Sequence, residues 1–246
     1  NSVSNYWGHW VSASANDFLS DTYRQISLTS DQTSRIGDGG YNLKTRYISW
    51  YGRAMYTLMD RYIVTATVRR DGSSNFGSGN RWGTFPSAAL AWRLSEENFM
   101  KDIDWLSNLK LRASIGQTGN QSISPYQTFA RLGTSGPIFG DGKDIGFGLS
   151  SMANDDLKWE TTTQTDIGVD FGFFSNRLNI GFDYYWKQTR DLLYNATLPP
   201  SSGYSSMLRN LGRIDNKGFE ISINTINMKG KVNWTTNLNI TSNKSI

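Results

Sequence analysis

The sequence predicts an all-β protein whose antiparallel strands form part of a transmembrane β-barrel, and three observations lead to that prediction. Aromatic residues and glycine are abundant, with nine Trp and 24 Gly among 246 residues, a bias that suits strands and turns. Apolar and polar residues alternate along several segments with the period of two that a strand imposes. Tight turns and long loops alternate between these segments, as they do at the two ends of an outer-membrane barrel.

The stretch from 61 to 76, RYIVTATVRRDGSSNF, shows the alternation most directly. One face would carry Tyr62, Val64, Ala66 and Val68, and the other Ile63, Thr65, Thr67 and Arg69. The turn-forming residues Asp71, Gly72 and Ser73 follow, where both faces become polar. One face of this strand therefore requires an apolar medium, and the segment alone does not say whether that medium is a protein core or a lipid.

Seven further segments alternate in the same way, which makes eight candidate strands in all. In the segment 178–187, for example, Ile180, Phe182 and Tyr184 stand two residues apart, with polar or small residues between them. The seven segments are residues 48–58, 87–94, 109–116, 166–173, 178–187, 219–224 and 232–240.

The connections between the candidate strands fall into two kinds. Residues 59–61, 174–177 and 228–230 are short enough for hairpin turns, and residues 95–108 make a somewhat longer link on the same side. At the opposite ends, long loops rich in Gly, Ser, Asn and Pro are expected near residues 71–84, 117–158 and 191–213, and residues 1–42 are expected to be a loop or strand end. Short turns on one side and long loops on the other indicate periplasmic and extracellular ends.

A soluble β-sandwich also alternates apolar and polar residues, so other features must separate it from a barrel. Several segments can exceed the roughly 9–11 residues that cross a bilayer, whereas globular strands cluster near about 5–6. Aromatic residues stand near the ends of the apolar faces, as with Trp50 and Trp186, and charged residues are nearly absent from those faces. These features favour a membrane barrel. A secreted or surface carbohydrate-binding β domain without transport activity stays open as the alternative.

Composition makes several other functions improbable. The chain has no cysteine for a disulfide or thiolate metal site, and a single histidine, His9. The formal charge of +4 comes from scattered Lys and Arg, without the basic block that would indicate nucleic-acid binding. No apolar run reaches the roughly 18 residues of a membrane helix. We expect no catalytic site, no cofactor, no bound metal and no nucleic-acid partner.

Four stretches resemble the barrel of the SusC/RagA family of TonB-dependent outer-membrane transporters. The resemblance covers roughly residues 45–246, and its most specific part is RRDGSS followed by RWGTFPS and AWRLS. The four stretches are ISWYGRAMYTL, RYIVTATVRRDGSSNFGSGNRWGTFPSAALAWRLSEENFM, LSNLKLRASIGQTGNQ and LKWETTTQTDIGVDFGFFSNRLNIGFDYYWKQTRDLL.

The resemblance implies a plugged barrel of about 22 strands, of which about eight lie in this chain. It implies a protein of the bacterial outer membrane that imports oligosaccharides or peptides with energy from TonB, and that works with a SusD-like surface lipoprotein. The outer-membrane lipid would face Tyr62, Val64, Ala66 and Val68, and the lumen would face Thr65, Thr67 and Arg69. No plug domain, TonB box or closing carboxy-terminal strand is recognisable, so an incomplete stretch of a longer protein is expected.

Two sets of residues are candidates for function. Aromatic side chains in the expected loops could contact a glycan or peptide, although most loop aromatics serve as packing anchors: Trp7, Trp10, Tyr126, Phe129, Phe139, Phe147, Tyr194 and Tyr204. Charged residues on the polar strand faces could line the lumen, where the carboxylates would pair with cations on neighbouring strands: Arg69, Arg93, Arg112, Asp166, Asp170, Asp183, Lys187 and Glu220.

Overall fold

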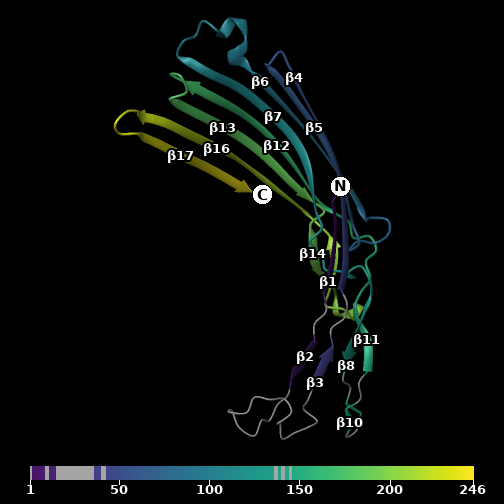
Figure 1. Cartoon of the computed structure of the whole chain (residues 1–246). Coiled ribbons are helices and arrows are strands. Elements are labelled where there is room, and N and C mark those ends of the chain that lie inside the picture. The colour runs from purple at the N-terminus through teal and green to yellow at the C-terminus, as the bar shows by residue number, and fades with distance from the viewer. Residues whose placement is uncertain are drawn as a thin grey trace.

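The computed structural model consists of one curved antiparallel sheet from which hairpins extend at one end (Figure 1). It describes residues 2–8, 11–14, 36–39, 43–135, 138–139, 142–143 and 146–246. The sheet has nine strands in the order β1-β4-β5-β6-β7-β12-β13-β16-β17. They are β1 (Ser2–Gly8), β4 (Leu43–Leu58), β5 (Tyr62–Ser73), β6 (Trp82–Arg93), β7 (Leu106–Asn120), β12 (Glu160–Phe173), β13 (Leu178–Arg190), β16 (Arg213–Met228) and β17 (Trp234–Ser245).

All eight expected strands occur in this sheet, each paired with its neighbour in antiparallel register. The ninth strand, β1, pairs with β4 from Ser2 opposite Ser49 to Gly8 opposite Leu43. The eight strands from β4 onward have 12 to 16 residues, longer than a bilayer crossing requires. Within the described residues β1 and β17 do not pair, so the sheet is part of a barrel and does not close. The predicted fold class is confirmed.

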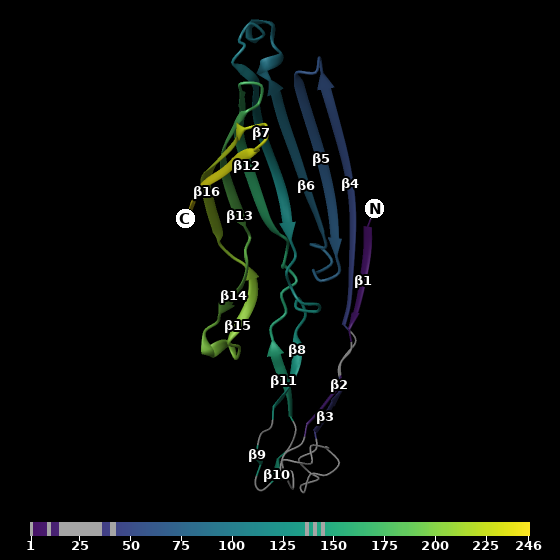
Figure 2. The ribbon, with the colours of Figure 1, turned by 60° about the vertical axis from the view of Figure 1, so that its left-hand side comes forward.

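The regions expected as long loops contain further short strands, which the sequence analysis did not predict. They extend beyond the end of the sheet that lies opposite the tight turns (Figure 2). These strands have only two to six residues each, too few to show a clear period of two, so alternation gave no signal for them. The hairpins are β2 (Val11–Ser14) with β3 (Ile36–Gly39), β8 (Arg131–Ser135) with β11 (Gly146–Ser151), β9 (Ile138–Phe139) with β10 (Gly142–Lys143), and β14 (Leu193–Thr197) with β15 (Ser206–Asn210).

Helical structure in the described residues is limited to three single 3₁₀ turns. η3 (Leu94–Glu96) and η4 (Asn98–Met100) lie in the link between β6 and β7, and η5 (Pro200–Ser202) lies between β14 and β15. None of the described helical segments has the length and apolar character to cross a membrane.

One face of the sheet is apolar and exposed. Val64 on β5 is opposite Tyr56 on β4 and Leu90 on β6, and the same row continues through Ile167 on β12 to Tyr184 on β13. Val64 is 44% exposed, Leu90 57% and Ile167 60%. A soluble protein would bury such a continuous apolar surface, whereas a barrel presents it to lipid. We call this surface the outer face.

Aromatic pairs mark both ends of the outer face. Trp50 and Trp82 stack with their ring centroids 5.1 Å apart toward the hairpin end. Tyr62 and Trp92 stack at 6.0 Å beside the tight turns. Two levels of aromatic rings on the outer face correspond to the girdles that sit at the two membrane interfaces.

The tight turns require residues that tolerate a left-handed backbone. Met59 and Asp60 have φ angles of 52° and 54°, and the Arg61 amide donates to the Leu58 carbonyl oxygen at 3.0 Å. Two successive positive φ angles define a type I′ turn, whose twist matches that of the flanking strands. The turn between β12 and β13 contains three such residues, Phe174 to Asn176. The turns expected at 59–61 and 174–177 are therefore confirmed, whereas the link expected at 228–230 lies at residues 229–233, between the end of β16 and the start of β17.

The buried core lies at the hairpin end of the polar face, beneath the loops. Phe85 of β6 packs against Trp159, with ring centroids 5.7 Å apart, and Phe76 packs against the same indole at 5.2 Å. A Cβ atom at Gly119 of β7 would overlap the Phe85 ring, so this position requires glycine for the close approach. Ile123 and Leu157 complete the cluster, and Leu193 and Leu208 pack against it. The cluster joins three connections, β5–β6, β7–β12 and β13–β16, to the sheet.

A second anchor lies at the tight-turn end. The Glu97 carboxylate, in the link between β6 and β7, accepts hydrogen bonds from the Tyr62 hydroxyl at 2.7 Å, the Trp92 indole at 3.0 Å and the Arg61 guanidinium at 3.0 Å. The hydrogen bonds from Tyr62 and Trp92, helped by the positive charge of Arg61, lower the pKa of Glu97. Ionised Glu97 thus ties the link to β5 and β6.

The Glu97 anchor predicts a pH-dependent stability. Because the folded pKa lies below the unfolded value of about 4.3, the contribution is complete above that pH and disappears as the pH falls through the folded pKa. Glu97→Gln should therefore lower the thermal unfolding midpoint of the full-length protein at pH 7 and change it progressively less below pH about 4. Exposed Glu96→Gln is the matched control. An equal loss at both pH values for Glu97→Gln would contradict the prediction.

The assignment of the two faces predicts opposite effects for neighbouring substitutions. Ala66 lies on the outer face midway between Tyr62, at one aromatic level, and Arg70, which is opposite Trp50 at the other level, and Thr65 points to the other face. Ala66→Arg should destabilise the full-length barrel by about 2–4 kcal/mol, the cost of Arg at the bilayer midplane. Thr65→Arg should have a much smaller effect. Denaturant unfolding in lipid vesicles measures both, and equal losses would mean that the faces are wrongly assigned.

Candidate functional site

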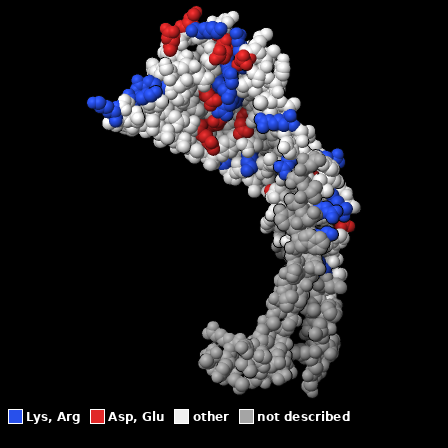
Figure 3. All heavy atoms as spheres, in the orientation of Figure 1, with Lys and Arg blue, Asp and Glu red and all other residues white. Residues whose placement is uncertain are grey.

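The polar face of the sheet, which lines the barrel interior, carries a charged cluster centred on Arg112 of β7. Its guanidinium donates two hydrogen bonds of 2.8 Å to Asp170 of β12 and lies 3.0 Å from Asp183 of β13. Lys110 Nζ is 4.0 Å from Asp170. Acidic and basic side chains lie together in a band on the upper part of the molecule (Figure 3). We call Lys110, Arg112, Asp170 and Asp183 the Arg112 cluster.

The strand register and one glycine bring these charges together. Arg112 is directly opposite Gly168, which is directly opposite Asp183 on the far side of β12. A Cβ atom at Gly168 would collide with the Asp183 carboxylate and come within 3.0 Å of Arg112 Nη2. The missing side chain therefore lets Arg112 and Asp183 meet across an intervening strand. Three strands are held in register by one cation between two carboxylates.

The remaining charged candidates are spread along the same face and do not join the cluster. Asp166 accepts hydrogen bonds from Ser114 at 3.1 Å and Gln164 at 2.8 Å. Arg69 pairs with Asp71 at 2.8 Å, and Arg93 donates to the Asp60 carbonyl oxygen at 3.4 Å. Lys187 is opposite Gln164 and Asn216, and Glu220 is opposite Asp183 and Thr241. Among the described residues, no group of three or more His, Asp or Glu could hold a metal ion.

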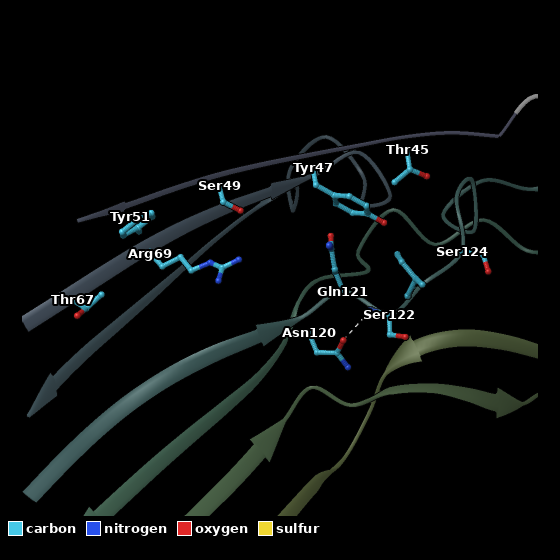
Figure 4. A pocket seen from close by; sticks show the side chains of 11 residues that line it. Thr45, Tyr47, Ser49, Tyr51, Thr67, Arg69, Asn120, Gln121, Ser122 and Ser124 are labelled. Atoms are coloured by element: carbon cyan, nitrogen blue, oxygen red, sulfur yellow. Dashed lines mark hydrogen bonds between the residues drawn. The ribbon is translucent and has the colours of Figure 1, made fainter. Parts of the chain in front are cut away.

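A hollow of about 1220 Å³ opens on the polar face near the hairpin end, between β4, β5 and the segment that follows β7 (Figure 4). Hydroxyl and amide groups dominate its walls, and its one charged side chain, Arg69, is neutralised by Asp71. Tyr51, 73% exposed, offers a ring face and a hydroxyl. The lining residues are Thr45, Tyr47, Ser49, Tyr51, Thr67, Arg69, Asn120, Gln121, Ser122, Ile123 and Ser124.

Buried Asn75 holds two walls of this hollow together. Its side-chain amide donates to the Tyr47 hydroxyl at 3.1 Å and to the Ile123 carbonyl oxygen at 2.9 Å. Within the wall that follows β7, the Asn120 side-chain oxygen accepts a hydrogen bond from the Ser122 amide at 3.1 Å, drawn as a dashed line in Figure 4. The hollow is thus a preorganised polar surface with one tyrosine ring free to contact a ligand.

The four loop aromatics whose side chains the structure describes do not line a common site. Tyr126 is 44% exposed, Phe129 56% and Tyr194 60%, whereas Tyr204 is half-buried. None of these four lines the hollow of Figure 4. Trp7, Phe139 and Phe147 belong to β1, β9 and β11, and their side chains, like all of Trp10, lie outside the described part of the chain.

Of the residues that line the hollow, only Arg69 was among the candidates from the sequence, and those missed include Tyr47, Tyr51, Asn120 and Gln121. The two tyrosines did have a signal in the sequence. Both fall on the polar face of the alternation in residues 43–58, and an aromatic ring is unusual on a strand face that is otherwise polar. Asn120 and Gln121 end the string GQTGNQ and carried no pattern of their own. Their position depends on how the end of β7 and the segment that follows it lie relative to β4 and β5, which is a tertiary feature.

The open curved sheet, the exposed apolar outer face and the polar interior define a segment of a large outer-membrane β-barrel. The family profile described as "TonB dependent receptor-like, beta-barrel" matches residues 2–244, and the chain belongs to this family. The resemblance to SusC/RagA transporters and the location in the bacterial outer membrane are thereby confirmed.

Individual relatives are similar over most of the chain. It is 46% identical over 227 residues to TonB-dependent receptor P3 of Formosa agariphila, covering 89% of the chain and 23% of that protein. It is 40% identical over 215 residues to TonB-dependent receptor SusC of Bacteroides thetaiotaomicron, covering 82% of the chain and 21% of SusC. The structure of the RagAB peptide importer in its closed-closed state superposes with a TM-score of 0.86 at 29% identity, covering 99% of the chain and 27% of the matched one. The chain thus spans about a quarter of the length of these proteins.

The Arg112 cluster predicts that Gly168 cannot be enlarged without loss. Gly168→Ala should push the Asp183 carboxylate away from Arg112 and destabilise the full-length barrel by about 1–3 kcal/mol, a typical cost of overpacking. Gly52→Ala is the control, because a Cβ atom at this β4 position meets no atom within 4 Å. Denaturant unfolding measures both variants. A Gly168→Ala protein as stable as the Gly52→Ala protein would show that the close approach contributes nothing.

Proposed function

We propose that this chain is part of the barrel of an active importer that takes up oligosaccharides or peptides across a bacterial outer membrane. The observation that supports this most is the division of one sheet into an exposed apolar outer face and a polar inner face that carries a preorganised hollow of about 1220 Å³. Such a division is typical of a barrel strand that separates membrane lipid from a water-filled lumen. The polar hollow stands near the extracellular end of that wall, where an arriving nutrient would first be held.

The chemistry of the inner face is that of binding. Both carboxylates of the Arg112 cluster are tied to one guanidinium, so neither is available as a general acid or base. Hydroxyl groups, amides and Tyr51 can hydrogen-bond to and stack on a polar ligand. The curated relatives are named as receptors, and one similar structure is titled a peptide importer. Binding followed by passage is therefore the function that we assign, in place of covalent chemistry.

Partners follow from the same proposal. Energy would come from TonB, which would act through a region of the full-length protein outside this chain. A SusD-like surface lipoprotein would cover the extracellular side, where the hairpins β8–β11 and β14–β15 extend. A secreted carbohydrate-binding domain is a weaker alternative, because its outer face would have to leave Val64, Leu90 and Ile167 in water.

The proposal predicts that Tyr51 contributes to nutrient capture. Deleting the full-length gene in its host should abolish growth on at least one oligosaccharide or peptide of a nutrient panel. On that nutrient, Tyr51→Ala should raise the half-saturation concentration of uptake roughly twofold to tenfold, the value of a lost aromatic contact. Tyr51→Phe should keep most of the affinity if the ring stacks on the ligand.

Tyr56→Ala is the matched control, since Tyr56 lies on the same strand, is 65% exposed and belongs to the outer face. It should leave the uptake of the nutrient unchanged. A deletion strain that grows normally on every oligosaccharide and peptide tested would refute import of these nutrients. Equal effects of Tyr51→Ala and Tyr56→Ala would refute the role of the hollow only.

A further inference from the structure

A cavity of about 320 Å³ lies on the inner face where β6 and β7 run side by side. Its floor consists of small residues, because Ser87 is directly opposite Gly116 and Ala89 is directly opposite Ser114. Side chains of the flanking strands β5 and β12 form its two sides. The inward-facing residues of its lining include Thr65 of β5, the four residues of the floor, and Gln164 and Asp166 of β12.

This cavity is continuous with other spaces at both ends. Toward the hairpin end, Ser87 is opposite Thr67, which lines the hollow of about 1220 Å³ at the side away from Ser124 (Figure 4). Toward the tight-turn end, a cavity of about 220 Å³ shares four lining residues with the first and extends to Arg112 and Asp183. We call the two smaller cavities together the β6–β7 groove. It prolongs the hollow along the inner face toward the periplasmic end.

The charged groups of the β6–β7 groove are already paired. The Asp166 carboxylate accepts hydrogen bonds from the Ser114 hydroxyl at 3.1 Å and from the Gln164 amide at 2.8 Å. Arg112 lies between the carboxylates of Asp170 and Asp183. A polar ligand in the groove would therefore meet hydroxyl groups, small side chains and compensated charges. Such a surface holds a ligand weakly, as a passage requires if the ligand is to move on.

The inner face of β13 differs from that of β6 and β7. The row that contains Ser87 and Gly116 continues through Gln164 to Lys187. The next row toward the tight turns continues from Ala89 and Ser114 to Tyr185. At both levels β13 thus places a long side chain where β6 and β7 have a small one or none. In the described part of the sheet, β6 and β7 leave more room beside the wall than β13 does.

We infer that an imported ligand leaves the hollow along the β6–β7 groove, which makes this sector of the wall the route of passage. The inference rests on the import function proposed above. The ligand, a polar oligosaccharide or peptide chain, would be held first at Tyr51 and would then pass Thr67 and Ser87 in an extended form. The hollow captures and the groove conducts. An obstacle in the groove therefore lowers the maximal rate of uptake, whereas a change in the hollow alters the half-saturation concentration.

The test places a removable obstacle in the groove of the full-length protein in its host. Ser87→Cys, in a background without other cysteines, is treated on intact cells with a membrane-impermeant biotin methanethiosulfonate, which attaches through a disulfide. The labelled protein should import its nutrient roughly tenfold more slowly at saturation, without a higher half-saturation concentration. A reductant that removes the label should restore the rate. Asn216→Cys is the matched control, because Asn216 continues the row of Ser87 on β16, and its label should leave uptake unchanged.

A permanent obstacle gives an independent measurement. Ser87→Trp should slow uptake at saturation as the label does, and Asn216→Trp should not. Heat-modifiable migration of each variant shows that the barrel is folded.

Three results would overturn the groove as the route. Normal uptake by the labelled Ser87→Cys protein would mean that the ligand passes elsewhere. Equal slowing by obstacles at both positions would reflect a general obstruction of the lumen. A Ser87→Cys protein that stays unlabelled while Asn216→Cys reacts would mean that another part of the full-length protein covers the groove. All three are measured with a nutrient on which the deletion strain fails to grow, so they concern the groove alone, whereas a deletion strain without any growth defect refutes import itself.

Discussion

The antiparallel register is the constraint on which the rest of the structure depends. Because side chains alternate across a strand, a slip of one residue would move every apolar side chain of that strand from lipid to the interior. The row from Tyr56 through Val64 and Leu90 to Ile167 stays on one side across five strands only if every ladder keeps its register. Two features fix that register at different positions in the sheet. One is the type I′ turn at Met59 and Asp60, and the other is the salt-bridged Arg112 cluster.

The ends of the sheet are stabilised by different means because they meet different surroundings. At the tight-turn end a single carboxylate, Glu97, gathers donors from three residues and fastens the one longer link. At the hairpin end the connecting segments are too long to be held by turns, and they pack on the cluster around Phe85 and Trp159. In the described part of the chain, the large polar hollow lies at this second end, where rigid support beneath the loops allows a binding surface to keep its shape.

Sequence reasoning succeeded where a local period carried the information. The eight strands, their apolar faces and the tight turns follow from alternation and turn chemistry over fewer than about 20 residues each. It failed for the loop hairpins, whose strands of two to six residues are too short to show a period, and for the hollow. Loop aromatics such as Tyr194 were candidates for a ligand surface from the sequence, but the aromatic residues that line the hollow are Tyr47 and Tyr51, from a strand.

By itself, the sequence determined the fold class, the family and which residues face lipid, because each of these depends on residue order along one strand or on a continuous motif. The tertiary structure alone decided which residues meet across strands. Gly168 is one of 24 glycines in the sequence, and it becomes the gap through which Arg112 reaches Asp183 only when β7, β12 and β13 lie side by side. Lys44 and Arg81 are likewise 37 positions apart and share a cavity only because the β4–β5 and β5–β6 ladders bring their segments together. Contacts between distant segments have no local signature, since their free energy is gained only after the sheet has formed.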